Sequence, residues 1–181
     1  MKQIKAETER LFIRQITQDD YEDIVEYGTD DETGQYMIYW PKTKDQIKEF
    51  VLHAIDNMKD ENPSVYEFVM VLKNDQKVIG NVSIKKEDGI SEIGWISNKK
   101  YWNKGLMTEG LSEILLLLKK ETDVRKIYAT CTEKNIGSYR VMEKIGMNRI
   151  EREENKESIK AGKKVRYAKL RYELDLNDKI V

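Results

Sequence analysis

The chain has few residues of the kind that form covalent or metal cross-links. Its 181 residues include a single cysteine, Cys131. One cysteine cannot form an intrachain disulfide, and it leaves no cluster of thiolates that would hold a structural zinc ion. These absences favour the reducing cytoplasm as the compartment, and we expect no bound metal.

Long apolar segments and an excess of one charge are also missing. The longest apolar run, residues 114–118, is far shorter than the roughly 20 residues of a membrane-spanning helix. The start of the chain lacks the apolar segment of a signal peptide. The 32 Lys and Arg residues balance 33 Asp and Glu, so no bulk field would hold polyanionic nucleic acid. We therefore expect neither a membrane nor nucleic acid as a partner, and the oligomeric state is left open.

The apolar residues that are present recur with clear periods. Charged residues make up 36% of the chain, yet this periodicity separates it from a disordered sequence. A chain of this length can bury most of its apolar surface around one core. We expect a single domain over residues 1–181.

Two periods predict the secondary structure. Alternation of apolar and polar residues indicates strands, and apolar residues three or four positions apart indicate helices. Capping-box-like sequences at Thr17 and Thr43 mark the first two helix starts. The expected strands are 10–16, 64–72, 77–84, 91–96 and 126–132, and a final hairpin joins 147–154 to 164–176 across a turn at 155–164. The expected helices are 17–27, 43–58, 106–121 and 136–145. This order predicts an α/β (α+β) fold with a mixed, mostly antiparallel sheet flanked by helices.

The stretch EIGWISNKKYWNKGLMTEG, residues 92–110, is the first indication of a ligand site. It runs from a strand through a polar loop into a helix, with Gly105 at the junction. The first amides of a helix have no internal partner, and the aligned peptide dipoles place partial positive charge there. Such a junction suits phosphate groups. Glycine is also common at these turns for conformational reasons alone.

A second motif, NIGSYRVMEKIGM, follows the expected strand 126–132. With ETERLFIRQITQDD, YWPKTKDQIKEF and YWNKGLMTEG, it covers almost the whole chain in an order that resembles the GNAT superfamily of N-acetyltransferases. The similarity is greatest to the branch that contains the Rim-type ribosomal-protein N-terminal acetyltransferases and related small-molecule acetyltransferases. The resemblance implies an acyltransferase that uses acetyl-CoA as cosubstrate and needs no metal.

The resemblance also implies where coenzyme A binds. The fourth and fifth strands, Ser91–Ile96 and Lys126–Thr132, are expected to splay apart and admit the pantetheine arm. The backbone of Trp95 and Ile96 would pair with pantetheine amides. Asn135 would hold the cosubstrate through its side chain or merely cap the following helix. The loop expected around the pyrophosphate comprises Asn103, Lys104, Gly105, Leu106, Met107 and Thr108.

Two residues are candidates for catalysis. The thiolate-protonating tyrosine of many superfamily members corresponds to Met142 here, and the resemblance to the Rim-type branch gives the role to Ser138, one helical turn earlier. Glu92 is a candidate general base for the attacking amine; the alternative is a solvent-facing strand residue. The cosubstrate loop also departs from the usual pattern, because Met107 stands where a small residue is usual.

The acceptor is expected to be a primary amine that attacks directly in a ternary complex. Tyr36, Tyr39 and Trp40 form an aromatic loop that would wall an acceptor pocket or pack as core. A protein N-terminal amine is one candidate acceptor, and a small amine such as a polyamine, an amino acid or an aminoglycoside is the other. A non-catalytic acyl-CoA-binding sensor is the alternative from another functional class.

Overall fold

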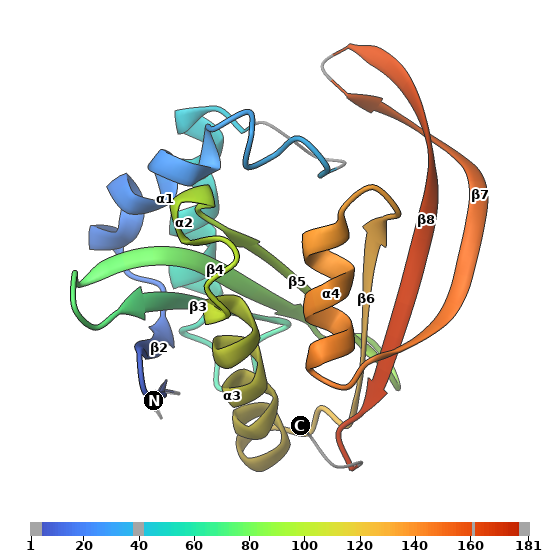
Figure 1. Ribbon diagram of the computed structural model, residues 1–181. Coiled ribbons are helices and arrows are strands. Elements are labelled where there is room, and N and C mark those ends of the chain that lie inside the picture. Colours follow the sequence, from blue (N-terminus) through green and yellow to red (C-terminus); the bar gives the residue numbers. More distant parts are fainter. Residues whose placement is uncertain (1–4, 38–41, 161, 178–181) are drawn as a thin grey trace.

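A computed structural model describes residues 5–37, 42–160 and 162–177, which form one eight-stranded sheet with helices on both faces (Figure 1). The strands are β1 (Lys5–Glu7), β2 (Leu11–Gln15), β3 (Val65–Leu72), β4 (Lys77–Lys85), β5 (Ser91–Ser97), β6 (Lys126–Thr132), β7 (Asn148–Lys160) and β8 (Lys163–Asp175). The helices are α1 (Tyr21–Gly28), α2 (Lys44–Asn57), α3 (Leu106–Glu121) and α4 (Ile136–Lys144), with short 3-10 helices η1 (Gln18–Asp20) and η2 (Lys99–Tyr101). The predicted mixed fold is confirmed.

The strand order across the sheet is β1-β2-β3-β4-β5-β6-β8-β7. Neighbouring strands are antiparallel except β5 and β6, which run parallel. The edge strand β1 was not expected from the sequence, so the predicted fourth and fifth strands are β5 and β6 here. The chain crosses from β5 to β6 through α3, as a parallel connection requires.

Two cores lie on opposite faces of the sheet. Phe68 and Met70 of β3 pack in the core that includes α3 and α4, and Val69 and Val71 pack in the core under α1 and α2. Side chains alternate between faces along a strand. Burial on both faces explains why β3 is apolar at nearly every position.

The predicted caps are present at the first two helix starts. A capping box joins Thr17 to Asp20, and the Thr17 amide donates to the Asp20 carboxylate at 2.7 Å. At α2, the Gln46 amide donates to the Thr43 hydroxyl at 3.2 Å, and the Thr43 amide donates to the Gln46 side chain at 2.9 Å. Each box satisfies amides that a helix start leaves free.

The last hairpin corrects the prediction of a turn at 155–164. β7 continues to residue 160 and β8 already begins at residue 163. Asn155 has a φ of +54° and lies where the register shifts between Glu153 and Lys156. β7 therefore carries one extra residue at this point, which makes Asn155 part of a β-bulge. The hairpin is longer than expected and extends well beyond β6 (Figure 1).

The parallel strands β5 and β6 are joined at one end only. They pair at Ser91 with Ile127 and at Glu92 with Tyr128. β5 nevertheless stays paired with β4 as far as Ser97. Beyond Glu92 the two strands therefore diverge, and the splay that the resemblance implied is confirmed.

Candidate active site

A cavity of about 740 Å³ lies where β5 and β6 diverge. This volume is typical of a small-molecule site. Trp95 and Ile96 line it from β5, although their side chains belong to the cores on opposite faces of the sheet. Residues from the start of α3, from α4 and from the segment after α1 complete the wall. The cavity therefore reaches both faces of the sheet.

The start of α3 presents free backbone amides to this cavity. Gly105 is the N-cap residue, with a φ of +75° that favours glycine. The amides of the next three residues have no intrahelical acceptor, and these residues, Leu106, Met107 and Thr108, all line the cavity. Asn103 also lines it. Lys104 is not among the lining residues, and its ammonium lies 5.3 Å from the centre of the Tyr101 ring.

Glu109 anchors this helix start to the beginning of the chain. Its carboxylate accepts a hydrogen bond from the Thr8 hydroxyl at 2.5 Å and from Arg10 Nε at 2.7 Å. Arg10 Nη1 also donates to the Lys104 carbonyl at 3.0 Å. Burial opposes ionisation of Glu109, but these hydrogen bonds outweigh it and lower its pKa. Glu109 thus has a structural role and holds the α3 amides in a fixed orientation.

Gly80 of β4 makes room for the unusual Met107. A Cβ atom at Gly80 would lie 3.2 Å from Met107 Cε and 2.5 Å from the Ile96 carbonyl oxygen. Any larger residue at position 80 would therefore collide with the wall of the cavity. Gly80 has no side chain, and this leaves the room that the bulky Met107 needs.

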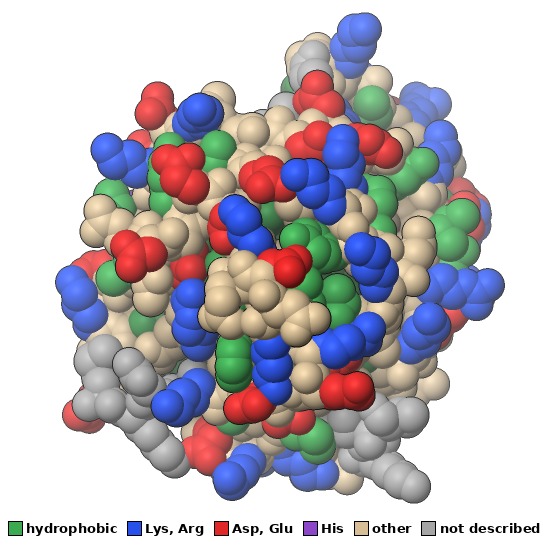
Figure 2. All heavy atoms as spheres, turned by 60° about the vertical axis from the view of Figure 1, so that its left-hand side comes forward, with side chains coloured by type: hydrophobic (Ala, Val, Ile, Leu, Met, Phe, Trp, Pro, Cys, Tyr) green, Lys and Arg blue, Asp and Glu red, His purple; other side chains and the backbone are tan. Residues whose placement is uncertain are grey.

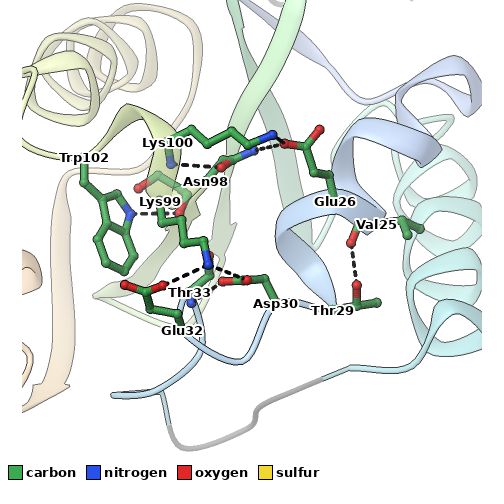
Figure 3. A network of polar contacts seen from close by, with 11 residues as sticks. Val25, Glu26, Thr29, Asp30, Glu32, Thr33, Asn98, Lys99, Lys100 and Trp102 are labelled. Atoms are coloured by element: carbon green, nitrogen blue, oxygen red, sulfur yellow. Dashed lines mark hydrogen bonds and ion pairs between the residues drawn. The ribbon is translucent and has the colours of Figure 1, made fainter.

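A polar network ties the segment after α1 to the loop after β5 (Figure 3). Lys99 Nζ lies 2.8 Å from both the Asp30 and the Glu32 carboxylates. The hydrogen bond from Lys99 is the main cause that lowers the pKa of Asp30 to about 2. Beside this network, Trp102 Nε1 donates to the Ser97 carbonyl at 2.9 Å. These contacts position two walls of the cavity that are far apart in the sequence.

α4 supplies the third wall. The Asn135 side-chain oxygen accepts from the Ser138 amide at 3.2 Å, so Asn135 caps the helix and also lines the cavity. Ser138 lines the cavity as well. Burial raises the pKa of the Cys131 thiol to about 11, although the nearby Ser138 side chain opposes the shift. Cys131 is therefore a protonated core residue at neutral pH. Met142 is 1% exposed and belongs to the core.

Basic groups provide the formal charge of the cavity wall. Arg140 and Lys144 line it one helical turn apart on α4, and none of the described lining residues is acidic. Figure 2 shows acidic and basic side chains interspersed over one face of the molecule. The wall thus suits an anionic ligand, because its fixed charges and the α3 dipole have the same sign.

Glu92 is not brought into the cavity wall. It occupies the paired end of β5, between Lys85 of β4 and Tyr128 of β6. The nearest lining residue on its strand, Trp95, is three positions away, or about 10 Å at the usual rise of a strand. The assignment of Glu92 as general base therefore has no direct geometric support.

The aromatic loop is only partly described. Tyr36 lines the cavity, and its carbonyl accepts from the Thr132 hydroxyl at 3.3 Å. Tyr39 and Trp40 lie outside the described residues. The far end of β7 also reaches this segment, because Lys160 Nζ donates to the carbonyls of Gly34, at 2.9 Å, and of Gln35. The segment after α1 thus forms a bridge between the two sides of the cavity.

Sequence reasoning missed part of this wall. Arg140 and Lys144 could have been found, because two basic residues four positions apart share one face of the expected helix. Thr33 and Met37 also line the cavity, but no local pattern marks them. In the described ranges, no helix is long and apolar enough to cross a bilayer, and no group of His, Cys, Asp or Glu side chains is placed to hold a metal ion.

Comparison with known proteins identifies the family. Residues 10–148 match the family model described as an acetyltransferase (GNAT) domain. The uncharacterized N-acetyltransferase YnaD of Bacillus subtilis (strain 168) is 35% identical over 144 residues, which cover 78% of this chain and 81% of that protein. A GNAT-family acetyltransferase from Bacillus anthracis has a similar structure, with a TM-score of 0.81, 29% identity and coverage of 96% and 99% of the two chains. A spermidine N-acetyltransferase from Vibrio cholerae, solved with CoA and spermine, shares the fold at a TM-score of 0.78, with 16% identity and coverage of 94% and 98%. The chain therefore belongs to the GNAT family of N-acetyltransferases.

Proposed function

We propose that this N-acetyltransferase transfers an acetyl group from acetyl-CoA to a primary amine by direct attack, with both substrates bound together. The observation that carries the proposal is the cavity between β5 and β6, which reaches both faces of the sheet. One substrate can enter from the α3 and α4 face while the other enters beside the segment after α1. No covalent enzyme intermediate is needed for this arrangement.

The charge of the wall and the free edge of β5 support acetyl-CoA as the cosubstrate. The free amides of residues 106–108 would hold the pyrophosphate, and Arg140 and Lys144 would add positive charge near phosphate groups. The free edge of β5 at Trp95 and Ile96 would pair with the pantetheine amides. When bound, acetyl-CoA supplies an activated acyl group. The CoA complex of the spermidine N-acetyltransferase with the same fold supports this choice of cosubstrate.

Ser138 would assist departure of the thiolate. It lies in the first turn of α4, on the cavity wall, where a hydroxyl can donate a hydrogen bond to developing negative charge. Met142 cannot donate a proton, and the Cys131 thiol is held in the core. Ser138 is therefore the better candidate among these three residues.

The proposal is tested by acetyl-CoA binding and by turnover. Acetyl-CoA at 100 times its dissociation constant should stabilise the fold by about 2.7 kcal/mol, which a melting experiment detects. Thiol release should then be measured with a panel of small amines and of peptides with free N-termini. A preference for one panel separates the two acceptor classes. Absence of a melting shift at millimolar acetyl-CoA would contradict the cosubstrate, and binding without turnover on any amine would indicate an acyl-CoA sensor instead.

A further inference from the structure

Glu67 of β3 is a buried carboxylate to which no role has been given. The residue is only 7% exposed. Its two carboxylate oxygens lie 2.7 and 2.6 Å from the Ser83 hydroxyl of β4. Within the described part of the chain, this single hydroxyl is the hydrogen-bond donor recorded for both oxygens. A buried carboxylate usually receives several donors, so Glu67 retains capacity to accept another hydrogen bond or a proton.

Glu67 is connected to the cavity through the register of the sheet. Glu67 pairs with Ser83, and Ser83 pairs with Gly94 of β5. These three residues form one row across the sheet, on the face that α1 and α2 cover in part. Two positions further along β5, on the same face, Ile96 lines the cavity. Ser83 therefore lies between the Glu67 carboxylate and the strand that borders the cavity.

Gly94 is exposed and leaves open space on this row. A Cβ atom built on Gly94 would have no heavy atom within 4 Å. With usual strand dimensions, Gly94 lies about 5 Å from Ser83 across the sheet and about 7 Å from Ile96 along the strand. Neither Gly94 nor Ser83 lines the cavity itself, so an amine would reach the Ser83 hydroxyl from the edge of the cavity at Ile96, across this open space.

The charged and titratable groups around Glu67 favour proton exchange near neutral pH. Burial raises the pKa of Glu67 to about 7, while the Ser83 hydrogen bond and the positive charge of Lys42 partly oppose this rise. Tyr27 of α1 faces the same region and donates to Asn81 of β4 at 2.9 Å. Burial holds the pKa of Tyr27 well above its ordinary value, so Tyr27 stays protonated. From β5, Glu92 faces the same side of the sheet.

We propose that Glu67, acting through the Ser83 hydroxyl, accepts the proton that a cationic acceptor amine must lose before it attacks the thioester. This inference rests on the proposed function. The ammonium donates one proton to Ser83 Oγ while the Ser83 hydroxyl proton passes to the Glu67 carboxylate, which later releases it to solvent. The nitrogen then forms the new C–N bond, the C–S bond breaks, and the leaving thiolate takes up the second amine proton.

The test compares Glu67→Gln with Glu92→Gln, the matched change of a carboxylate on the same face of the sheet. The measured quantity is kcat/KM for an alkyl amine identified by the panel, from pH 6 to pH 9.5. An alkyl amine near pKa 10.4 is almost wholly charged at pH 7. We expect Glu67→Gln to lower kcat/KM about 100-fold at pH 7, with a smaller defect at pH 9.5. Ser83→Ala should share this pH-dependent defect, and Glu92→Gln should follow the parent.

Two further measurements separate a proton-transfer role from a structural one. The melting shift with acetyl-CoA should be the same in the parent, Glu67→Gln and Ser83→Ala, because none of these changes touches the cosubstrate wall. The infrared band of a protonated carboxylic acid should titrate near neutral pH in the parent and be missing in Glu67→Gln. A parental pH profile for Glu67→Gln, or a defect confined to Glu92→Gln, overturns this inference while the proposed function stands. If the parent acetylates no amine, the proposed function and this inference both fail.

Discussion

Replacing Glu67 by glutamine should change how the stability of the fold depends on pH. Glutamate ionises near its ordinary pKa of 4.5 in the unfolded chain, whereas burial raises the pKa of folded Glu67 to about 7. Between these pH values the unfolded chain binds fewer protons than the folded chain, so the free energy of unfolding falls as pH rises. Below pH 4.5 both states keep the proton, so the free energy of unfolding no longer changes with pH through this group. From pH 4.5 to pH 7 the free energy of unfolding falls by about 3 kcal/mol, at 1.36 kcal/mol per pH unit.

The assay is urea unfolding of the parent and of Glu67→Gln at several pH values. Glutamine keeps the size of the side chain and cannot ionise, so this pH dependence is removed. The difference in free energy of unfolding, variant minus parent, should increase by about 2 kcal/mol from pH 5 to pH 7.5. Other titrating groups cancel in this difference when they lie far from Glu67. Parallel curves for the two proteins would refute the reasoning, and Glu92→Gln, at an incompletely buried site, serves as the charge-matched control.

Three changes in the cavity wall test its separate parts. Gly105→Val should weaken acetyl-CoA binding more than tenfold, because the φ of +75° is strained for a β-branched residue; a variant that folds and shows the parental melting shift would contradict this role for the loop. Arg140→Glu should lower the affinity for coenzyme A and flatten its dependence on salt, measured by calorimetry at two ionic strengths; an unchanged affinity would place the phosphates elsewhere. Ser138→Ala should lower kcat about ten- to a hundredfold with little change in acetyl-CoA affinity; full kcat with chemistry rate-limiting would leave the serine as a helix residue only.

Local signals predicted most of the fold, and non-local pairing decided the exceptions. The caps at Thr17 and Thr43 are local, and both are present in the structure. Asn155 misled the prediction, because a turn and a bulge both favour a residue with positive φ. Only the partner strand distinguishes the two. β1 was missed because three residues are too few to show a period, and its existence depends on pairing with β2.

The sequence predicted those residues of the site that lie where a loop leads into a helix. Gly105 and Ser138 lie at helix starts that the sequence marks, and both line the cavity. The alternation of β5 indicates which residues share a face with Glu92, but the end at which β5 leaves β6 is a property of the whole sheet. Glu67 did carry a signal, since it is one acidic residue within the apolar run VYEFVMVL. An alternating strand can expose such a residue to water, and only the two-sided burial of β3 shows that it is enclosed.

Two residue pairs join β5 to β6, and they connect two parts of the sheet, which we call plates. One plate contains β1 to β5 and the other contains β6, β8 and β7. A rotation of one plate about Ser91 and Glu92 would displace the far ends of the strands, near Ser97 and Thr132, more than the paired ends. The wall formed by α4 and the wall formed by the start of α3 are carried by different plates. A ligand that pairs with the free edge of β5 and contacts α4 would add a further connection between the two plates, beside the hydrogen bonds that Thr132 and Lys160 make with the segment after α1.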